Sequence, residues 1–150
     1  MQFAARFSPD EKWVVFAGTR TGPAVKQIFI TARDGGAGPQ QWVPLTDGAA
    51  VEQEPYWSPD GKRIYYVSDR DGSRCIWARG VDPATGTPIG VPFPVLHFHH
   101  SRQMLRGPSA YTGEIGLSVS ENFLVATVTE TKGNVWVQAM GSLLTERTGK

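Results

Sequence analysis

The chain has 150 residues, a mass of 16.4 kDa and a formal net charge of +1 at pH 7. This charge excludes a strongly basic nucleic-acid-binding chain, and an apolar content of 40% with 11% aromatic residues excludes a disordered tail. The 17 Gly and 11 Pro residues favour many turns over long helices.

The chain has a single cysteine, Cys75, which excludes an intrachain disulfide and a metal cage built from cysteines. Its apolar runs are all too short to span a membrane. Residues 1–7 lack the basic and apolar regions of a signal peptide and instead predict a strand.

An internal repeat organises the sequence. The motif Phe-Ser-Pro-Asp at residues 7–10 recurs as Trp-Ser-Pro-Asp at residues 57–60, an offset of 50 residues. Apolar, β-prone segments follow each copy at the same offset, and residues 117–126 form a weaker third copy. Repeating units of this length, each with several short strands, are typical of the blades of a β-propeller.

Each of the first two units predicts four strands joined by turns. The strands of the first unit are expected at residues 2–7, 12–17, 26–32 and 41–45, and those of the second at 55–57, 63–68, 74–79 and 91–98. Hairpin turns at residues 58–61 and 69–72 should hold Gly61 and Gly72 at positive φ. Glu11 replaces the glycine of the equivalent first turn, so that turn is predicted to be strained or of another type. Pro92 and Pro94 place the last strand of the second unit at a sheet edge.

The predicted fold is therefore all-β, a partial β-propeller with two four-stranded antiparallel blades and a third, incomplete blade. The blades are expected at residues 2–48, 54–98 and 114–140, with an irregular connection at 99–113 that holds at most one helical turn near 101–105, and a frayed tail at 141–150. Three blades cannot close a ring, so we expect the chain to be the C-terminal part of a longer protein and to self-associate alone. The side chains expected to be largely buried are Phe7, Trp57, Ile64, Tyr66, Ile76, Val125 and Trp136, and Trp13 and Trp77 are also expected in the core.

Residues 57–72, which read Trp-Ser-Pro-Asp-Gly-Lys-Arg-Ile-Tyr-Tyr-Val-Ser-Asp-Arg-Asp-Gly, resemble the WD-like repeat of TolB-type β-propellers. Similar repeats form the propeller of prolyl-oligopeptidase-type peptidases. Residues 94–100 and 131–136 also resemble the ends of bacterial multidomain regulators, in which a kinase or winged-helix DNA-binding module precedes a TolB-like propeller.

The resemblance implies a non-catalytic scaffold that binds a protein or a small ligand at a propeller face, within a larger bacterial signalling or envelope protein. The alternative is the substrate-gating propeller of a serine peptidase whose catalytic domain lies outside this chain. The remaining blades of the parent are the other implied partner, while nucleic-acid contact and a membrane span are not expected. The resemblance favours the bacterial periplasm over the cytoplasm.

Motifs for catalysis are not found. Residues 107–111 (Gly-Pro-Ser-Ala-Tyr) fail the Gly-x-Ser-x-Gly pattern at its last position, so we expect no catalytic residue and no cofactor. Residues 69–72 (Asp-Arg-Asp-Gly) resemble the start of a calcium loop but lack its terminal glutamate, which favours a simple turn.

The three histidines are the only candidate metal ligands. His97 and His99 would point to one face of a strand, and His100 is adjacent. Because no carboxylate or cysteine lies within ten residues on either side, the sequence favours a polar strand end over a metal site.

Overall fold

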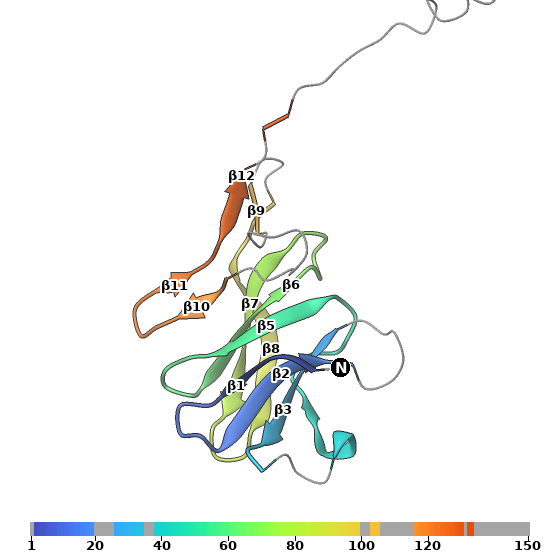
Figure 1. Cartoon of the computed structure of the whole chain (residues 1–150), viewed down its shortest axis with the longest axis vertical. Helices are drawn as coiled ribbons and strands as arrows, with labels where there is room; N and C mark the ends of the chain where they lie inside the picture. Colours follow the sequence, from blue (N-terminus) through green and yellow to red (C-terminus); the bar gives the residue numbers. More distant parts are fainter. Residues whose placement is uncertain are drawn as a thin grey trace, which may run out of the picture.

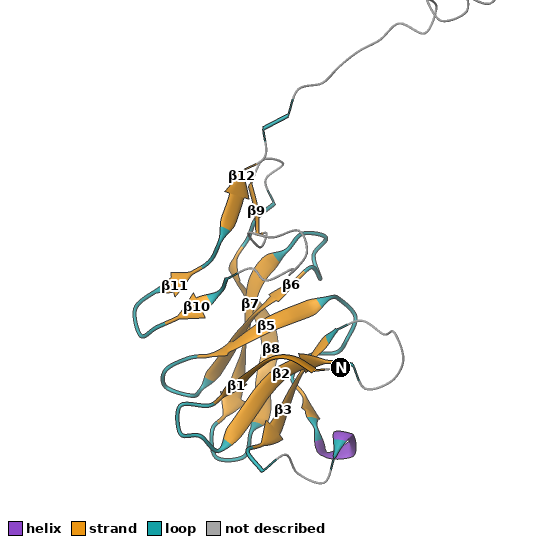
Figure 2. Ribbon diagram, in the orientation of Figure 1, coloured by secondary structure: helices purple, strands orange, loops and turns teal. Residues whose placement is uncertain are grey.

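A computed structural model describes residues 2–19, 26–34, 38–99, 103–105, 116–130 and 132–133. Within these ranges the backbone is almost entirely strand and turn, and the one helical element described is a single 3-10 turn, Pro39–Gln41. Figure 2 shows this turn as the purple segment beside the strands. The all-β class predicted from the sequence is confirmed.

Two four-stranded antiparallel sheets form the body of the molecule, and in each the strands follow one another in chain order. The first sheet contains β1 (Gln2–Phe7), β2 (Trp13–Gly18), β3 (Gln27–Ala32) and β4 (Val43–Pro44). The second contains β5 (Glu52–Trp57), β6 (Arg63–Ser68), β7 (Cys75–Asp82) and β8 (Thr87–Leu96). Two consecutive meanders of this kind, packed face to face, are successive blades of a partial β-propeller (Figure 1). The strand β8 lies at the outer edge, as its prolines predict.

The third unit differs from the predicted three-stranded sheet. β10 (Ser118–Val119) pairs with β11 (Leu124–Val125), whereas β12 (Val128–Glu130) pairs with β9 (Gln103–Leu105) from the connecting segment. The connection was expected to hold at most one helical turn near residues 101–105, and its residues 103–105 are extended and pair with β12. The expected last strand, Trp136 and the tail lie outside the described residues.

The predicted hairpin turns are confirmed. Gly61 has a φ of 68° and its N–H donates to the Ser58 carbonyl at 2.9 Å, while Gly72 has a φ of 88°. Glu11 holds a φ of 57° and donates to the Ser8 carbonyl at 2.9 Å. The first unit therefore forms the same turn as the second, and Glu11 adopts a left-handed conformation that strains any residue with a Cβ.

A second feature repeats at the same offset and was not predicted. Ala4 and Glu54 have φ values of 52° and 53°, and each lies where the pairing of the first two strands of its sheet shifts register. Both sheets therefore carry a bulge at the same position of their first strand. The sequence gives no signal for it, because neither position is a glycine.

The main core lies between the two sheets. Val15, Ile28 and Ile30 of the first sheet meet Ile64 and Tyr66 of the second, and all five are fully buried. A smaller core joins the second sheet to the third unit and is formed by Val67, Ile76, Leu105 and Leu117. Burial is confirmed for four of the side chains named from the sequence: Trp57, Ile64, Tyr66 and Ile76.

Two burial predictions are wrong. Phe7 is 59% exposed although it occupies the position of Trp57, because no described sheet covers the outer face of the first sheet. Val125 is 61% exposed. It follows Leu124, which packs on the smaller core, and strand alternation turns the next side chain to solvent.

Tryptophans link the two sheets. The Trp13 indole donates to the Pro83 carbonyl at 2.9 Å, and the Trp57 indole donates to the Arg6 carbonyl at 3.3 Å. Trp13 and Trp77 both pack against the main core, as predicted. Trp42 meets the Phe16 ring edge-on, with centroids 4.8 Å apart.

Candidate functional site

The repeated Ser-Pro-Asp turns have a structural role. In the second unit the Asp60 carboxylate accepts from the Ser58 hydroxyl at 2.5 Å and from the Lys62 N–H at 3.0 Å. Asp10 of the first unit accepts from Ser8 at 2.7 Å. In each turn the serine hydrogen bond has the largest effect on the aspartate and lowers its pKa. The pKa of Asp60 is lowered, and that of Asp10 is lowered to about 2. The carboxylates are thus charged turn anchors.

A shallow polar groove lies beside the turn of the second unit. It has a volume of about 320 Å³ and lies between this turn and the β10–β11 turn. Its lining residues are Ser58, Pro59, Asp60, Arg63, Tyr65, Ser120 and Glu121. In Figure 1 the turns β1–β2, β5–β6 and β10–β11 all lie on the left side of the molecule. The first turns of successive units therefore share one face, and the groove opens on it.

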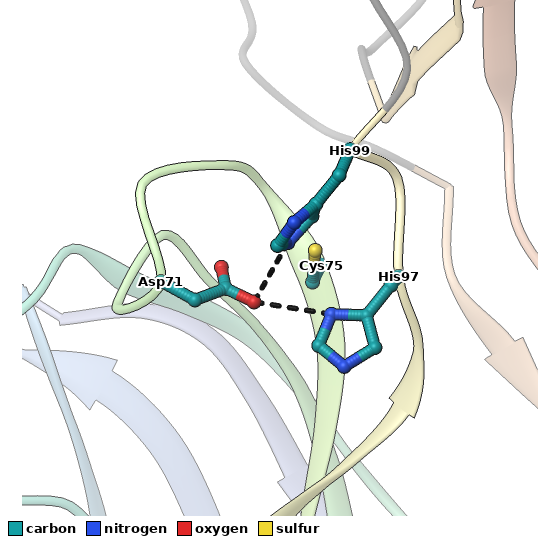
Figure 3. Close-up of side chains that lie close together, drawn as sticks. All are labelled: Asp71, Cys75, His97 and His99. Atoms are coloured by element: carbon teal, nitrogen blue, oxygen red, sulfur yellow. Dashed lines mark hydrogen bonds and ion pairs between the residues drawn. The ribbon is translucent and has the colours of Figure 1, made fainter.

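A second cluster of chemically reactive side chains lies at the outer end of the second sheet. Asp71 comes from the turn between β6 and β7, and Cys75 is the first residue of β7. His97 and His99 follow the end of β8, which pairs with β7. Figure 3 shows the Asp71 carboxylate directed toward both imidazole rings, with Cys75 between them.

The distances within this cluster are short. The Asp71 Oδ2 atom lies 3.1 Å from His97 Nδ1 and 2.9 Å from His99 Nε2. The one oxygen, the two nitrogens and Cys75 Sγ all lie within 4.8 Å of one another. Cys75 is fully buried, whereas the histidine side chains are about half exposed. The cluster is therefore open to solvent on the histidine side and closed beneath the sulfur.

Electrostatics differ between the two acidic members. Burial raises the pKa of the Cys75 thiol and outweighs the hydrogen bond that the Phe98 N–H donates to the sulfur at 3.3 Å. Partial burial also acts to raise the pKa of Asp71, but hydrogen bonds from His99 and the Ser73 N–H outweigh it, and the pKa is lowered. Asp71 is therefore a carboxylate and Cys75 a thiol at neutral pH.

Aromatic contacts orient the two histidine rings. The His97 ring meets the Trp77 indole edge-on, with centroids 6.0 Å apart, and meets the His99 ring in the same manner at 4.9 Å. Arg70 also contacts Trp77, because its guanidinium lies 5.3 Å from the Trp77 ring centroid. The same guanidinium lies 2.9 Å from the buried Glu52 carboxylate. Arg70 forms ion pairs with Glu52 and Asp47.

The sequence identified half of this cluster. His97 and His99 lie side by side as alternation predicts, while His100 lies outside the described residues. Asp71 and Cys75 were missed because they are more than twenty residues away in the chain. Residues 69–72 do form the predicted turn, closed by the Gly72 N–H on the Asp69 carbonyl at 2.9 Å. The Asp69 side chain accepts instead from the Val51 N–H, so only Asp71 faces the histidines.

In the described part of the chain, no helix is long and apolar enough to cross a membrane.

Comparison with known proteins gives partial matches. No family model matches the chain. Over 70 residues, 44% of its length, it is 36% identical to Dipeptidyl-peptidase 5 of Porphyromonas gingivalis. Over 58 residues, 39% of its length, it is 34% identical to the Tol-Pal system protein TolB of Bordetella pertussis. These segments cover 10% and 13% of the two relatives. The resemblance to TolB-type proteins is thus supported over part of the chain.

Two solved structures of TolB proteins also match. The protein of Agrobacterium tumefaciens superposes with a TM-score of 0.47 and 31% identity, covering 61% of this chain and 31% of its own. TolB of Acinetobacter baumannii gives a TM-score of 0.47 and 22% identity, covering 85% of this chain and 29% of its own. The chain therefore spans less than a third of these structures and about a tenth of the curated relatives it matches.

Proposed function

We propose that this chain is a non-catalytic segment of a β-propeller that serves as a binding scaffold within a larger bacterial envelope or signalling protein. The two blade-type sheets support the scaffold role, because they enclose a shared core of apolar side chains. The sequence similarity to TolB supports a place in a bacterial envelope protein, and with it a periplasmic location.

The observation that carries the proposal is the groove between the first turns of the second and third units. It is shallow and polar, and it presents charges of both signs, Arg63 beside Asp60 and Glu121. The hydrogen bonds of the turn hold Asp60 in its charged form. A lining of this kind suits a polar peptide segment of a protein partner better than an apolar small molecule.

A site-specific photocrosslinker tests this role. Placed at Tyr65 in the groove, it should give a covalent adduct with a single partner from extracts of the source cell, and placed at the exposed Thr87 it should not. The charge-reversed variant Arg63→Glu should lose the adduct while its thermal melting stays unchanged. Equal crosslinking from both positions would contradict a groove-specific partner.

The match to Dipeptidyl-peptidase 5 favours a second candidate, a propeller that gates substrate entry to a serine peptidase. The two candidates differ in the parent protein. A Gly-x-Ser-x-Gly region in the parent gene, together with labelling of the parent by a fluorophosphonate probe, would support the peptidase. The scaffold proposal expects neither result.

A further inference from the structure

Four potential metal ligands converge at the end of the second sheet, and they come from three separate segments. Asp71 is held by the β6–β7 turn, Cys75 by β7, and His97 and His99 by the residues after β8. Each offers one ligand atom, and the four atoms lie within 4.8 Å of one another. The convergence thus depends on the tertiary pairing of β7 with β8 and not on local sequence.

We propose that Asp71, Cys75, His97 and His99 bind one Zn²⁺ ion in a tetrahedral site. In such a site, metal–ligand bonds of about 2.0–2.3 Å separate neighbouring ligand atoms by about 3.3–3.6 Å. The Asp71 oxygen lies 2.9 and 3.1 Å from the two histidine nitrogens. Movements of a few tenths of an ångström bring the oxygen to this spacing from each nitrogen. Ligand atoms that lie up to 4.8 Å apart must approach by up to about 1.5 Å, which rotation of the half-exposed histidine rings allows.

The charges of the ligands match a divalent ion. A thiolate and a carboxylate supply two negative charges, and two neutral imidazoles supply none, so the complex with Zn²⁺ is neutral. On binding, the Cys75 S–H bond breaks, its proton leaves to solvent and the sulfur bonds to the metal. The Phe98 N–H already donates to this sulfur and is placed to stabilise the thiolate.

The ligand types select among metals. One sulfur and two imidazole nitrogens favour Zn²⁺ or Co²⁺ over Mg²⁺ and Ca²⁺, which prefer oxygen ligands. The alternative to a metal site, a cluster held by hydrogen bonds alone, explains why both histidines contact the Asp71 carboxylate. It gives no reason for the lone thiol of the chain to lie within 4.8 Å of all three groups.

Four protein ligands make the site closed, which is typical of structural zinc and not of catalytic zinc. The ion would tie the β6–β7 turn to the chain leaving β8, at the outer edge of the blade. It would thereby fix an edge strand that carries several prolines and pairs, among the described strands, with β7 alone. This role is independent of the groove on the turn face.

Metal titration of the full chain, freed of metal with a chelator, tests the site. Calorimetry should show one Zn²⁺ per chain with a Kd of about 0.1 µM or tighter, and no binding of Mg²⁺. Co²⁺ should give the visible bands of tetrahedral coordination and a thiolate charge-transfer band. Failure of Zn²⁺ to bind in a one-to-one ratio, or a Co²⁺ spectrum without the thiolate band, would overturn the proposal.

Variants separate the four-ligand site from incidental binding by the histidine pair. His99→Ala, Asp71→Asn and Cys75→Ser should each weaken Zn²⁺ binding by more than about 100-fold, whereas Glu130→Gln, an exposed carboxylate elsewhere, should not. Because Cys75 is buried, the thermal melting of each variant is first measured without metal, which shows whether the substitution itself unfolds the chain. Zn²⁺ at about 100 times its Kd should raise the Tm of the unaltered chain by about 5–10 °C. Unchanged affinity in Asp71→Asn and His99→Ala would show that the cluster is not the site.

Discussion

The equivalent turn residues Glu11 and Gly61 offer a paired test of the repeat. Both hold a left-handed backbone conformation, with φ values of 57° and 68°, but only Glu11 carries a Cβ. A Cβ added at Gly61 would meet Pro9 at 3.7 Å and Pro83 at 4.0 Å, which are ordinary contacts. Gly61→Ala therefore introduces backbone strain without a steric clash. Strain of about 1–2 kcal/mol, partly offset by the lower entropy of the unfolded alanine chain, predicts a loss of about 1 kcal/mol.

The reciprocal change, Glu11→Gly, should stabilise the chain. It relieves the same strain but removes the ion pair of Glu11 with Arg33, whose side chains are 67% and 61% exposed. Exposed pairs contribute about 0–1 kcal/mol, so the expected net gain is about 0.5 kcal/mol. In an Arg33→Ala background, where the pair is already absent, the gain from Glu11→Gly should be larger.

Urea unfolding followed by tryptophan fluorescence measures these differences, and 1 kcal/mol corresponds to about 2–4 °C in Tm for a chain of this size. Gly133→Ala is the matched control, because Gly133 lies outside the left-handed region and has open space around it. If Gly61→Ala and Gly133→Ala changed stability equally, or if Glu11→Gly destabilised the Arg33→Ala chain, the argument from backbone strain would be refuted.

Three further predictions concern packing and charge. Gly86 has a φ of 66° and a Cβ there would lie 2.7 Å from the Trp13 ring, so Gly86→Ala should cost about 2–3 kcal/mol in urea unfolding. Trp13→Leu should remove the part due to the clash and leave about 1 kcal/mol of backbone strain; fully additive losses would contradict the clash. Trp57→Ala should cost about 3–5 kcal/mol, because the side chain is only 7% exposed between the sheets. The pKa of Asp10 is lowered to about 2, so its stabilising contribution is complete above its ordinary value of 3.8 and is lost as the pH falls toward 2. The free energy of unfolding, measured from pH 5 to pH 2, should therefore depend less on pH in Asp10→Asn than in the unaltered chain. An unchanged slope of this free energy against pH would refute the turn-anchor role.

The repeat predicted the fold because each unit carries its own local signals. Ser58, Asp60 and Gly61 specify one turn, because its hydrogen bonds and backbone conformation depend on residues that are close together in the chain. Burial of a given side chain depends also on which sheet lies opposite. Phe7 and Trp57 share one position in the repeat, yet Trp57 is enclosed by the first sheet and Phe7 faces no described sheet.

The candidate metal site could not be read from the sequence because its assembly depends on strand register. Near the β7–β8 turn, Gly80 pairs with Ile89, and continuing that register would place Cys75 opposite Pro94. Register shifts between Ala78 and Gly80 and between Ile76 and Trp77 move the pairing by three residues, so that Ile76 pairs with Leu96. The same shifts bring Cys75 level with His97 and within reach of His99. Bulges of this kind arise from the twist and side-chain packing of the whole sheet, which is why the histidines alone pointed to a polar strand end.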